Sequence, residues 1–236
     1  MGDGKHAGGR ESGAKTVRRA ILFELEYVAV AGRQIKFDTM KAALKGTRVD
    51  LSLTAFSRYC LHRSAKAGVE ALLASAGKSA ASAEVLERYQ AGIAEAFSDG
   101  GLKVDAAYEA ILKVVRKHNL RMGVLSSLDA ATTEALSRKL DLASHGAVMF
   151  TISANDQRAY SGDHWMHLAR RVETAPRRCV TICTQSDSCQ AALAARMRCI
   201  VRPDAYTAFQ DFSGADSVTE HITPAVIELV LDVKAE

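Results

Sequence analysis

The order of the predicted strands and helices constrains the fold of this chain more than any other feature. An apolar run at residues 20–25 is typical of a buried strand, whereas residues 34–98 show apolar side chains at helical spacing and no convincing strand. After Gly100 and Gly101, short apolar strands alternate with helices of about ten residues. This alternation predicts βαβ units and therefore a parallel sheet.

These patterns predict an α/β fold in two parts. Residues 18–32 and 102–236 form a Rossmann-like core, a parallel sheet with helices on both faces, and residues 33–101 form an inserted cap, a small bundle of about four short helices. Sheets of this kind bind ligands at the carboxyl ends of their strands, so we expect the cap over that edge. Strands are predicted at residues 20–25, 121–126, 147–151, 179–183 and, as the final one, 198–201; core helices are predicted at residues 106–118, 132–140, 164–172, 189–196 and 223–233.

Composition argues against several classes of function. The chain has 236 residues and a net charge of +4, of which +3 falls within residues 1–19, so the rest is nearly neutral and does not suggest nucleic-acid binding. Residues 1–17 are expected to form a flexible basic tail. No apolar run predicts a membrane span or a secretory signal, and five cysteines without paired spacing favour a reducing, cytoplasmic compartment.

Two carboxylates mark the end of the first predicted strand. Glu24 and Glu26 are two residues apart, so in a strand they point to the same side and could converge at the carboxyl edge of the sheet. A convergent pair could hold a metal ion. Alternatively, both groups are solvated acids that accept hydrogen bonds from nearby backbone amides.

Three later segments suggest a family. Residues 123–127 read Gly-Val-Leu-Ser-Ser, residues 191–201 read Ala-Ala-Leu-Ala-Ala-Arg-Met-Arg-Cys-Ile-Val, and residues 211–216 read Asp-Phe-Ser-Gly-Ala-Asp. With the strand that ends in two acids and the helical insertion, they make the chain resemble the haloacid dehalogenase-like (HAD) superfamily, in its capped phosphatase and β-phosphoglucomutase-like branch. The resemblance spans residues 18–222 and implies the capped α/β fold.

The resemblance also implies a phosphoryl-transfer site, with substitutions at its first two positions. In the family, an aspartate at the position of Glu24 attacks phosphorus, and a second aspartate at the position of Glu26 protonates the leaving oxygen. The serine or threonine that holds phosphoryl oxygens is retained as Ser126. Glu24, Glu26 and Ser126 are therefore the candidate catalytic residues. Tyr27 stands where a glycine is usual.

Two further positions of the family site differ in the second half of the chain. The family lysine falls near Ala159, beside Arg158, and the acidic pair that holds Mg²⁺ falls at Cys183 and Thr184. The nearest carboxylate is Asp187. The candidate metal ligands are thus Glu24, Glu26 and Asp187, and we expect Mg²⁺ binding to be weak or absent.

Candidate substrate-binding residues come from the cap and from strand ends. Arg63 and Lys66 lie where capped relatives contact substrate, and Ser126, Ser127 and Arg158 complete the set. Alternatively, these residues bind no ligand: the basic side chains form part of a charged surface, and Ser126 is an ordinary residue at a strand end.

Histidines and cysteines offer weaker metal candidates. His164 and His167 share one face of a predicted helix, but no third ligand is evident. The four cysteines within residues 179–199 lack the tight paired spacing of zinc sites, so we expect buried apolar side chains.

The substitutions favour a pseudoenzyme, a HAD-like fold that serves as a binding or regulatory module for a protein partner or a small phosphorylated ligand. Glutamate is one methylene longer than aspartate, and a misplacement of about 1 Å can cost roughly 10²-fold in rate. Loss of the lysine removes positive charge from the transition state. The alternative is an active Mg²⁺-dependent phosphohydrolase, a phosphoric monoester phosphatase that acts on a small phosphorylated metabolite with a glutamate-containing site.

Overall fold

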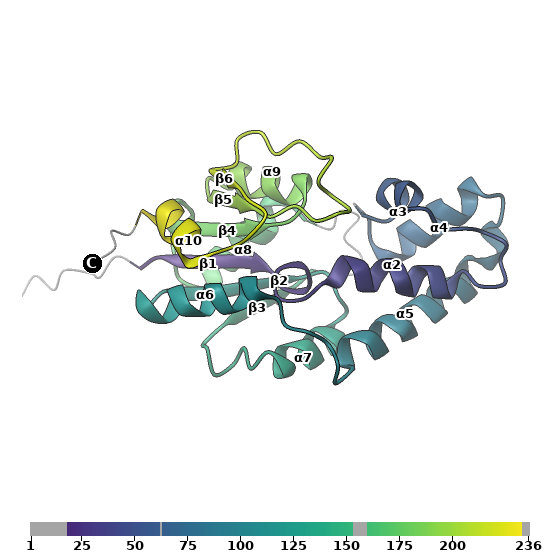
Figure 1. Cartoon of the computed structure of the whole chain (residues 1–236), viewed down its shortest axis with the longest axis horizontal. Helices are drawn as coiled ribbons and strands as arrows, with labels where there is room; N and C mark the ends of the chain where they lie inside the picture. Colours follow the sequence, from purple (N-terminus) through teal and green to yellow (C-terminus); the bar gives the residue numbers. More distant parts are fainter. Residues whose placement is uncertain (1–17, 62, 153–159, 233–236) are drawn as a thin grey trace, which may run out of the picture.

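A six-stranded parallel sheet forms the centre of the molecule (Figure 1). The computed structural model describes residues 18–61, 63–152 and 160–232, so the predicted tail lies outside the described residues. The strand order is β3-β2-β1-β4-β5-β6, and this sheet confirms the predicted α/β, Rossmann-like fold. The strands are β1 (Ala20–Glu24), β2 (Arg121–Ser126), β3 (Val148–Thr151), β4 (Cys179–Cys183), β5 (Arg198–Val201) and β6 (Ser217–Val218).

Both faces of the sheet are covered by helices, and β1 shows why. Every residue of β1 is buried. Because side chains alternate along a strand, Ile21 and Phe23 join the core cluster of one face, and Ala20 and Leu22 join the other. The first cluster includes side chains of α6 (Ala106–Lys117), α7 (Ala130–Lys139) and α10 (Pro224–Leu231), and the second includes side chains of α8 (Gly162–Arg171) and α9 (Ser186–Ala194).

The cap is a bundle of helices inserted after the first strand. It lies beyond the carboxyl ends of the strands, at one end of an elongated molecule (Figure 1). In the helix formed by residues 82–98, side chains at helical spacing, such as Val85, Tyr89 and Ile93, are buried against the rest of the bundle. The cap contains α2 (Gly32–Ala43), α3 (Leu53–Tyr59), α4 (Ala65–Ser75), the 3₁₀ helix η1 (Ser79–Ala81) and α5 (Ser82–Ser98).

Side-chain caps fix where several helices begin. Asp105, Asp129 and Thr223 each accept a hydrogen bond from a backbone amide in the first turn of α6, α7 and α10. Ser52 and Ser64 do the same for α3 and α4. These bonds satisfy amides that have no partner within the helix, so short polar residues start helices at these points.

Two predicted details were wrong. The first strand ends at Glu24, because Leu25 begins the short helix α1 (Leu25–Val28). Strand β5 is also not the last one: Ser217 and Val218 of β6 pair with it in parallel. β6 has only two residues and Val218 is 54% exposed, so it carries no apolar periodicity that a sequence pattern could reveal.

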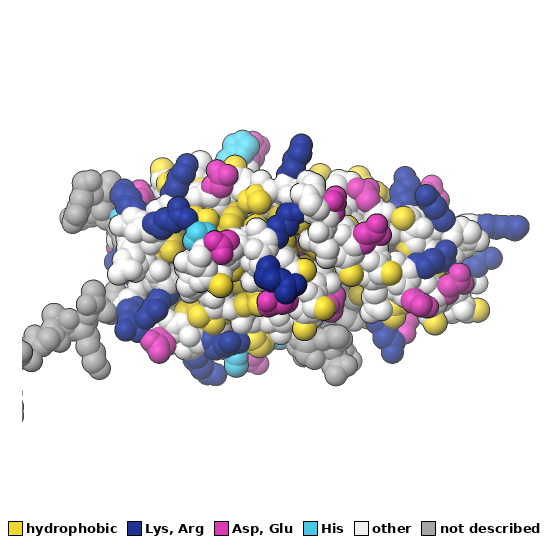
Figure 2. Space-filling view, turned by 90° about the horizontal axis from the view of Figure 1, so that it is seen from below, with side chains coloured by type: hydrophobic (Ala, Val, Ile, Leu, Met, Phe, Trp, Pro, Cys, Tyr) yellow, Lys and Arg dark blue, Asp and Glu magenta, His cyan; other side chains and the backbone are white. Residues whose placement is uncertain are grey.

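Charged side chains are spread over the surface. Figure 2 shows lysine, arginine, aspartate and glutamate interspersed over the core and the cap on the face in view. Within the described ranges, no helix combines the length and apolar character needed to cross a bilayer. The 3₁₀ helix η2 (Pro176–Arg178), which precedes β4, contributes two exposed arginines to this surface.

We predict that Gly32→Ala destabilises the fold. A Cβ at Gly32 would lie 2.1 Å from the backbone oxygen of Glu26, so α1 and α2 could not keep their close approach. Overpacking of this kind costs up to about 3 kcal/mol. Urea unfolding would measure the loss. Gly100→Ala is the control, because a Cβ there meets no atom within 4 Å. Equal stability of the two variants would contradict the prediction.

Candidate functional site

The two glutamates of the predicted site are completely buried. Glu24 is the last residue of β1, and Glu26 lies in the helical turn α1, so they are not neighbours on one face of a strand. Both side chains have zero exposure. The alternative that they are solvated acids is therefore wrong. Burial of a carboxylate is costly, which makes the partners of each group decisive.

Glu24 lies against β4 and the start of the cap. The hydroxyl of Thr184 donates a hydrogen bond to its Oε2, and Nη2 of Arg33 lies 4.0 Å from the same oxygen. Burial raises the pKa of Glu24 to about 7, although the positive charge of Arg33 opposes the rise. The other oxygen, Oε1, accepts no hydrogen bond from the described residues. Glu24 therefore keeps its proton to a higher pH than an ordinary glutamate does.

Arg33 is a buried cation at the point where the cap begins. It is the second residue of α2 and is 2% exposed. Its Nη1 donates to Asp204 Oδ2 at 2.7 Å, and its Nη2 donates to Gln185 Oε1 at 2.7 Å. Burial lowers the pKa of Arg33, but the charges of Asp204 and Glu24 outweigh it. The guanidinium carbon also lies 4.1 Å from the centre of the Tyr27 ring.

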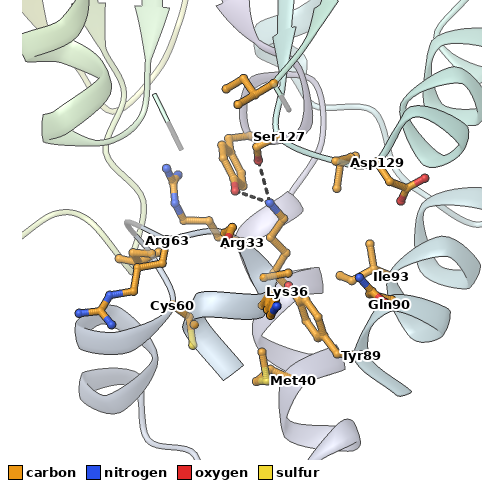
Figure 3. Close-up of a pocket in the computed structure, with 18 of the residues that line it drawn as sticks. Arg33, Lys36, Met40, Cys60, Arg63, Tyr89, Gln90, Ile93, Ser127 and Asp129 are labelled. Atoms are coloured by element: carbon orange, nitrogen blue, oxygen red, sulfur yellow. Dashed lines mark hydrogen bonds between the residues drawn. The ribbon is translucent and has the colours of Figure 1, made fainter. Parts of the chain in front are cut away.

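Glu26 has a separate set of partners. Its Oε1 accepts hydrogen bonds from the backbone amide of Ser127, at 2.9 Å, and from the Ser127 hydroxyl. Lys36 Nζ lies 3.7 Å from the same oxygen and donates to Tyr27 Oη at 2.5 Å and to Ser127 Oγ at 3.1 Å (Figure 3). The negative charge of each glutamate is thus balanced by its own cation: Arg33 for Glu24 and Lys36 for Glu26.

The donors around Glu24 do not fit a magnesium site. Mg²⁺ takes oxygen ligands, usually carboxylates and water, but β4 is followed by Thr184 and Gln185. Gln185 Oε1 is bound to Arg33, and Asp187 Oδ1 accepts from Gln185 Nε2 at 2.6 Å and from the Ser188 amide at 2.7 Å. In the part of the chain that the structure describes, no group of three histidine, cysteine, aspartate or glutamate side chains could hold a metal. A guanidinium 4.0 Å from Glu24 would also repel a divalent cation.

A cavity of about 480 Å³ lies between the core and the cap. Arg63 and Lys66, both predicted to contact a ligand, line it, together with Ser127. Glu24 and Glu26 do not line it. Lys36 lines the cavity and also contacts Glu26 and Ser127, so it connects the cavity with the buried carboxylate of Glu26. Tyr27 lines the cavity as well and accepts a hydrogen bond from Lys36.

The remaining predicted residues lie elsewhere. Ser126 is fully buried, its Oγ lies 3.0 Å from the Thr133 hydroxyl and accepts from the Leu128 amide, and it does not line the cavity. Arg158 lies outside the described residues.

The histidine and cysteine candidates have structural surroundings. His164 and His167 pack against the ring of Phe150, with ring centres 5.9 Å and 4.6 Å apart. The cysteines of β4, α9 and β5 are free thiols and are buried, as expected.

Sequence reasoning missed the two cations that dominate the site. Arg33 and Lys36 are three residues apart at the start of α2, so they share one face of the helix. The sequence did offer one indication of their role, because both cations follow shortly after Glu24 and Glu26. Tyr27, taken only as a departure from a pattern, contacts both of them.

The sheet order, the inserted cap and a ligand-sized cavity at the carboxyl edge define a class: capped, doubly wound α/β proteins. No protein-family model matches the sequence, and no curated protein matches it. Solved structures do match the fold, and they include HAD-type hydrolases and a mutase. The chain therefore has the capped HAD-like fold.

Three of these structures illustrate the likeness. CbbY from Rhodobacter sphaeroides, in complex with phosphate, has a TM-score of 0.69 and 18% identity, over 92% of this chain and 100% of that one. β-Phosphoglucomutase from Clostridium difficile has a TM-score of 0.69 and 14% identity, over 92% and 98%. A HAD family hydrolase from Deinococcus radiodurans, with bound phosphate and sodium, has a TM-score of 0.67 and 21% identity, over 91% and 95%. At these identities the likeness concerns the fold.

We predict a pH-dependent stability that depends on Glu24. Its pKa of about 7 exceeds the ordinary value of 4.5, so the folded protein holds this proton more tightly than the unfolded chain. The stabilisation is complete below pH 4.5 and is lost as the pH rises through 7. Wild type should therefore lose about 2 to 3 kcal/mol relative to Glu24→Gln between about pH 5 and pH 8.

Urea unfolding across that pH range checks this prediction. Glu87→Gln, which removes an exposed carboxylate of α5, is the control and should follow wild type at every pH. A constant difference between wild type and Glu24→Gln would show that Glu24 does not titrate in this range.

We also predict that Arg33 and Glu24 are energetically coupled. Arg33→Met leaves a buried carboxyl without its cation and should cost about 3 kcal/mol or more. In a Glu24→Gln background the same change should cost at least about 1 kcal/mol less. Arg88→Met, at a surface ion pair with Glu84, is the control and should cost less than about 1 kcal/mol. Equal costs in both backgrounds would mean that Arg33 acts only through Asp204 and Gln185.

Proposed function

We propose that this protein binds a small phosphorylated molecule in the cavity between core and cap, and that it does not hydrolyse it by the Mg²⁺-dependent route of the proteins it resembles. The proposal rests on one observation: the carboxylate at the nucleophile position is buried and is compensated by Arg33, a cation of the chain itself. On this view the protein is a pseudoenzyme that serves as a binding or regulatory module.

Access supports the proposal. A nucleophile must come within about 3 to 3.5 Å of the atom it attacks. Glu24 has no exposed surface and does not line the cavity, whereas Arg33 does. A phosphoryl group in the cavity would meet the basic side chains before it met Glu24.

Charge supports it as well. With a pKa of about 7, Glu24 is only partly ionised at neutral pH, and its ionised fraction is paired with Arg33. A carboxylic acid is neither a good nucleophile nor a good Mg²⁺ ligand. We expect Mg²⁺ to bind weakly, because Cys183 and Thr184, the predicted positions of the acidic pair, carry no carboxylate, and neither does the next residue, Gln185.

An active phosphohydrolase is the second candidate. Glu24 Oε1 and Glu26 Oε2 are buried oxygens without a hydrogen bond from the described residues, and a cation could in principle bind to them. The structural neighbours include a hydrolase with bound phosphate and sodium, which favours this alternative at the level of fold.

For the pseudoenzyme, we further propose a reducing, cytoplasmic location and a protein partner.

We predict negligible hydrolysis of p-nitrophenyl phosphate in millimolar MgCl₂, because the nucleophile is enclosed and the metal ligands are absent. Release of p-nitrophenol measures turnover, with Glu24→Gln as the matched blank. Mg²⁺ should also leave the melting temperature unchanged. Turnover of about 1 s⁻¹ that disappears in Glu24→Gln would refute the pseudoenzyme and establish the phosphohydrolase.

A further inference from the structure

The cavity between core and cap has two chemically different ends. Lys36 and Ser127 form a polar end beside the sheet, and Met40, Tyr89 and Ile93 lie on the side of Lys36 away from Ser127 (Figure 3). We propose that the cavity selects an organic phosphate with a compact apolar body, of the size of an aryl group, over a sugar phosphate. This inference rests on the proposed function and adds the class of ligand.

Lys36 is the group that would hold the phosphate. An ammonium has three donors, and two of them are used on Tyr27 Oη and Ser127 Oγ. One donor therefore remains at a side chain that lines the cavity and is 16% exposed. Burial lowers the pKa of Lys36, but Tyr27 and Glu26 outweigh this effect, so the ammonium stays charged.

The rim strengthens the preference for an anion. Arg63 and Lys66 line the cavity and are exposed, and Arg63 points away from Lys36 in Figure 3, so these two act as charges near the entrance. The acid among the lining residues, Asp129, is committed to the first turn of α7, where it accepts from the amide and the hydroxyl of Thr132. The cations that line the cavity therefore favour an anionic group, and Lys36 offers it a donor beside Ser127.

The apolar end comes from three different cap helices. Met40 of α2, Phe56 of α3 and Ile93 of α5 all line the cavity and are at most 6% exposed. Burying an apolar group against such side chains is favourable in proportion to the apolar area removed from water. A wall of this composition matches a hydrocarbon ring better than a carbohydrate.

A sugar would meet few partners at this end. The polar residues that Figure 3 labels on the side of Ile93 are Tyr89, Gln90 and Asp129, and Asp129 already accepts two hydrogen bonds from Thr132. Each sugar hydroxyl that loses water without gaining a hydrogen bond weakens binding. A cavity of about 480 Å³ is also within the range of small-molecule sites, so an aryl phosphate is small enough to fit in it.

The test compares three probes by calorimetry in the absence of Mg²⁺: phenyl phosphate, glucose monophosphate and inorganic phosphate. We expect phenyl phosphate to bind at least about tenfold more tightly than either of the others. Lys36→Met should weaken phenyl phosphate by about tenfold or more. Lys41→Met, the same change at an exposed lysine of the same helix, should leave the affinity unchanged.

The outcomes separate this inference from the proposed function. Glucose monophosphate that binds as tightly as phenyl phosphate overturns the apolar selectivity and leaves the binding module intact. Failure of all three probes to bind overturns both proposals. If Lys36→Met fails to fold, the ranking of the three probes on wild type still decides the matter. Mg²⁺-dependent hydrolysis of phenyl phosphate would refute only the pseudoenzyme, because the ratio of KM values for the two esters would still report selectivity.

Discussion

The buried charge of Glu24 is the constraint on which the site depends. A carboxyl with no exposed surface at the end of the central strand must be protonated or paired, and here it is partly both. Its cation, Arg33, is also bonded to Gln185 and Asp204, so one guanidinium joins the first strand, the segment after β4 and the segment after β5. Removal of Glu24 or Asp204 takes an anion from the buried guanidinium, whereas removal of Gln185 leaves one of its donors without an acceptor.

The fold could be predicted from the sequence because its signals are local and repeated. β1 is apolar up to its last residue, Glu24, and α6 has one apolar face. The spacing of apolar residues therefore indicates which segment is a strand and which is a helix. The alternation of these elements then leaves few topologies. β6 and α1 escaped prediction because two residues or four cannot show a period.

The site could be predicted only in part, because its partners meet through tertiary contacts. The sequence places Glu24 and Glu26 at a strand end, but it does not show that Arg33 turns back onto one and Lys36 onto the other. Whether a lysine is a surface charge or a buried partner is decided by the packing of α2 on α1, which depends on Gly32. No periodicity encodes that contact.

A cation supplied by the chain differs from a bound metal in what it permits. A guanidinium offers hydrogen-bond donors but no coordination position, so it can neutralise Glu24 but cannot act as a Lewis acid on a phosphoryl oxygen. It also ties the cap to the core. Arg33 binds Asp204, Gln34 accepts from the Tyr206 hydroxyl at 2.8 Å, and the Tyr206 ring packs 5.7 Å from those of Phe37 and Phe56. Full opening of the cap would therefore break the buried ion pair of Arg33 with Glu24, which is costly.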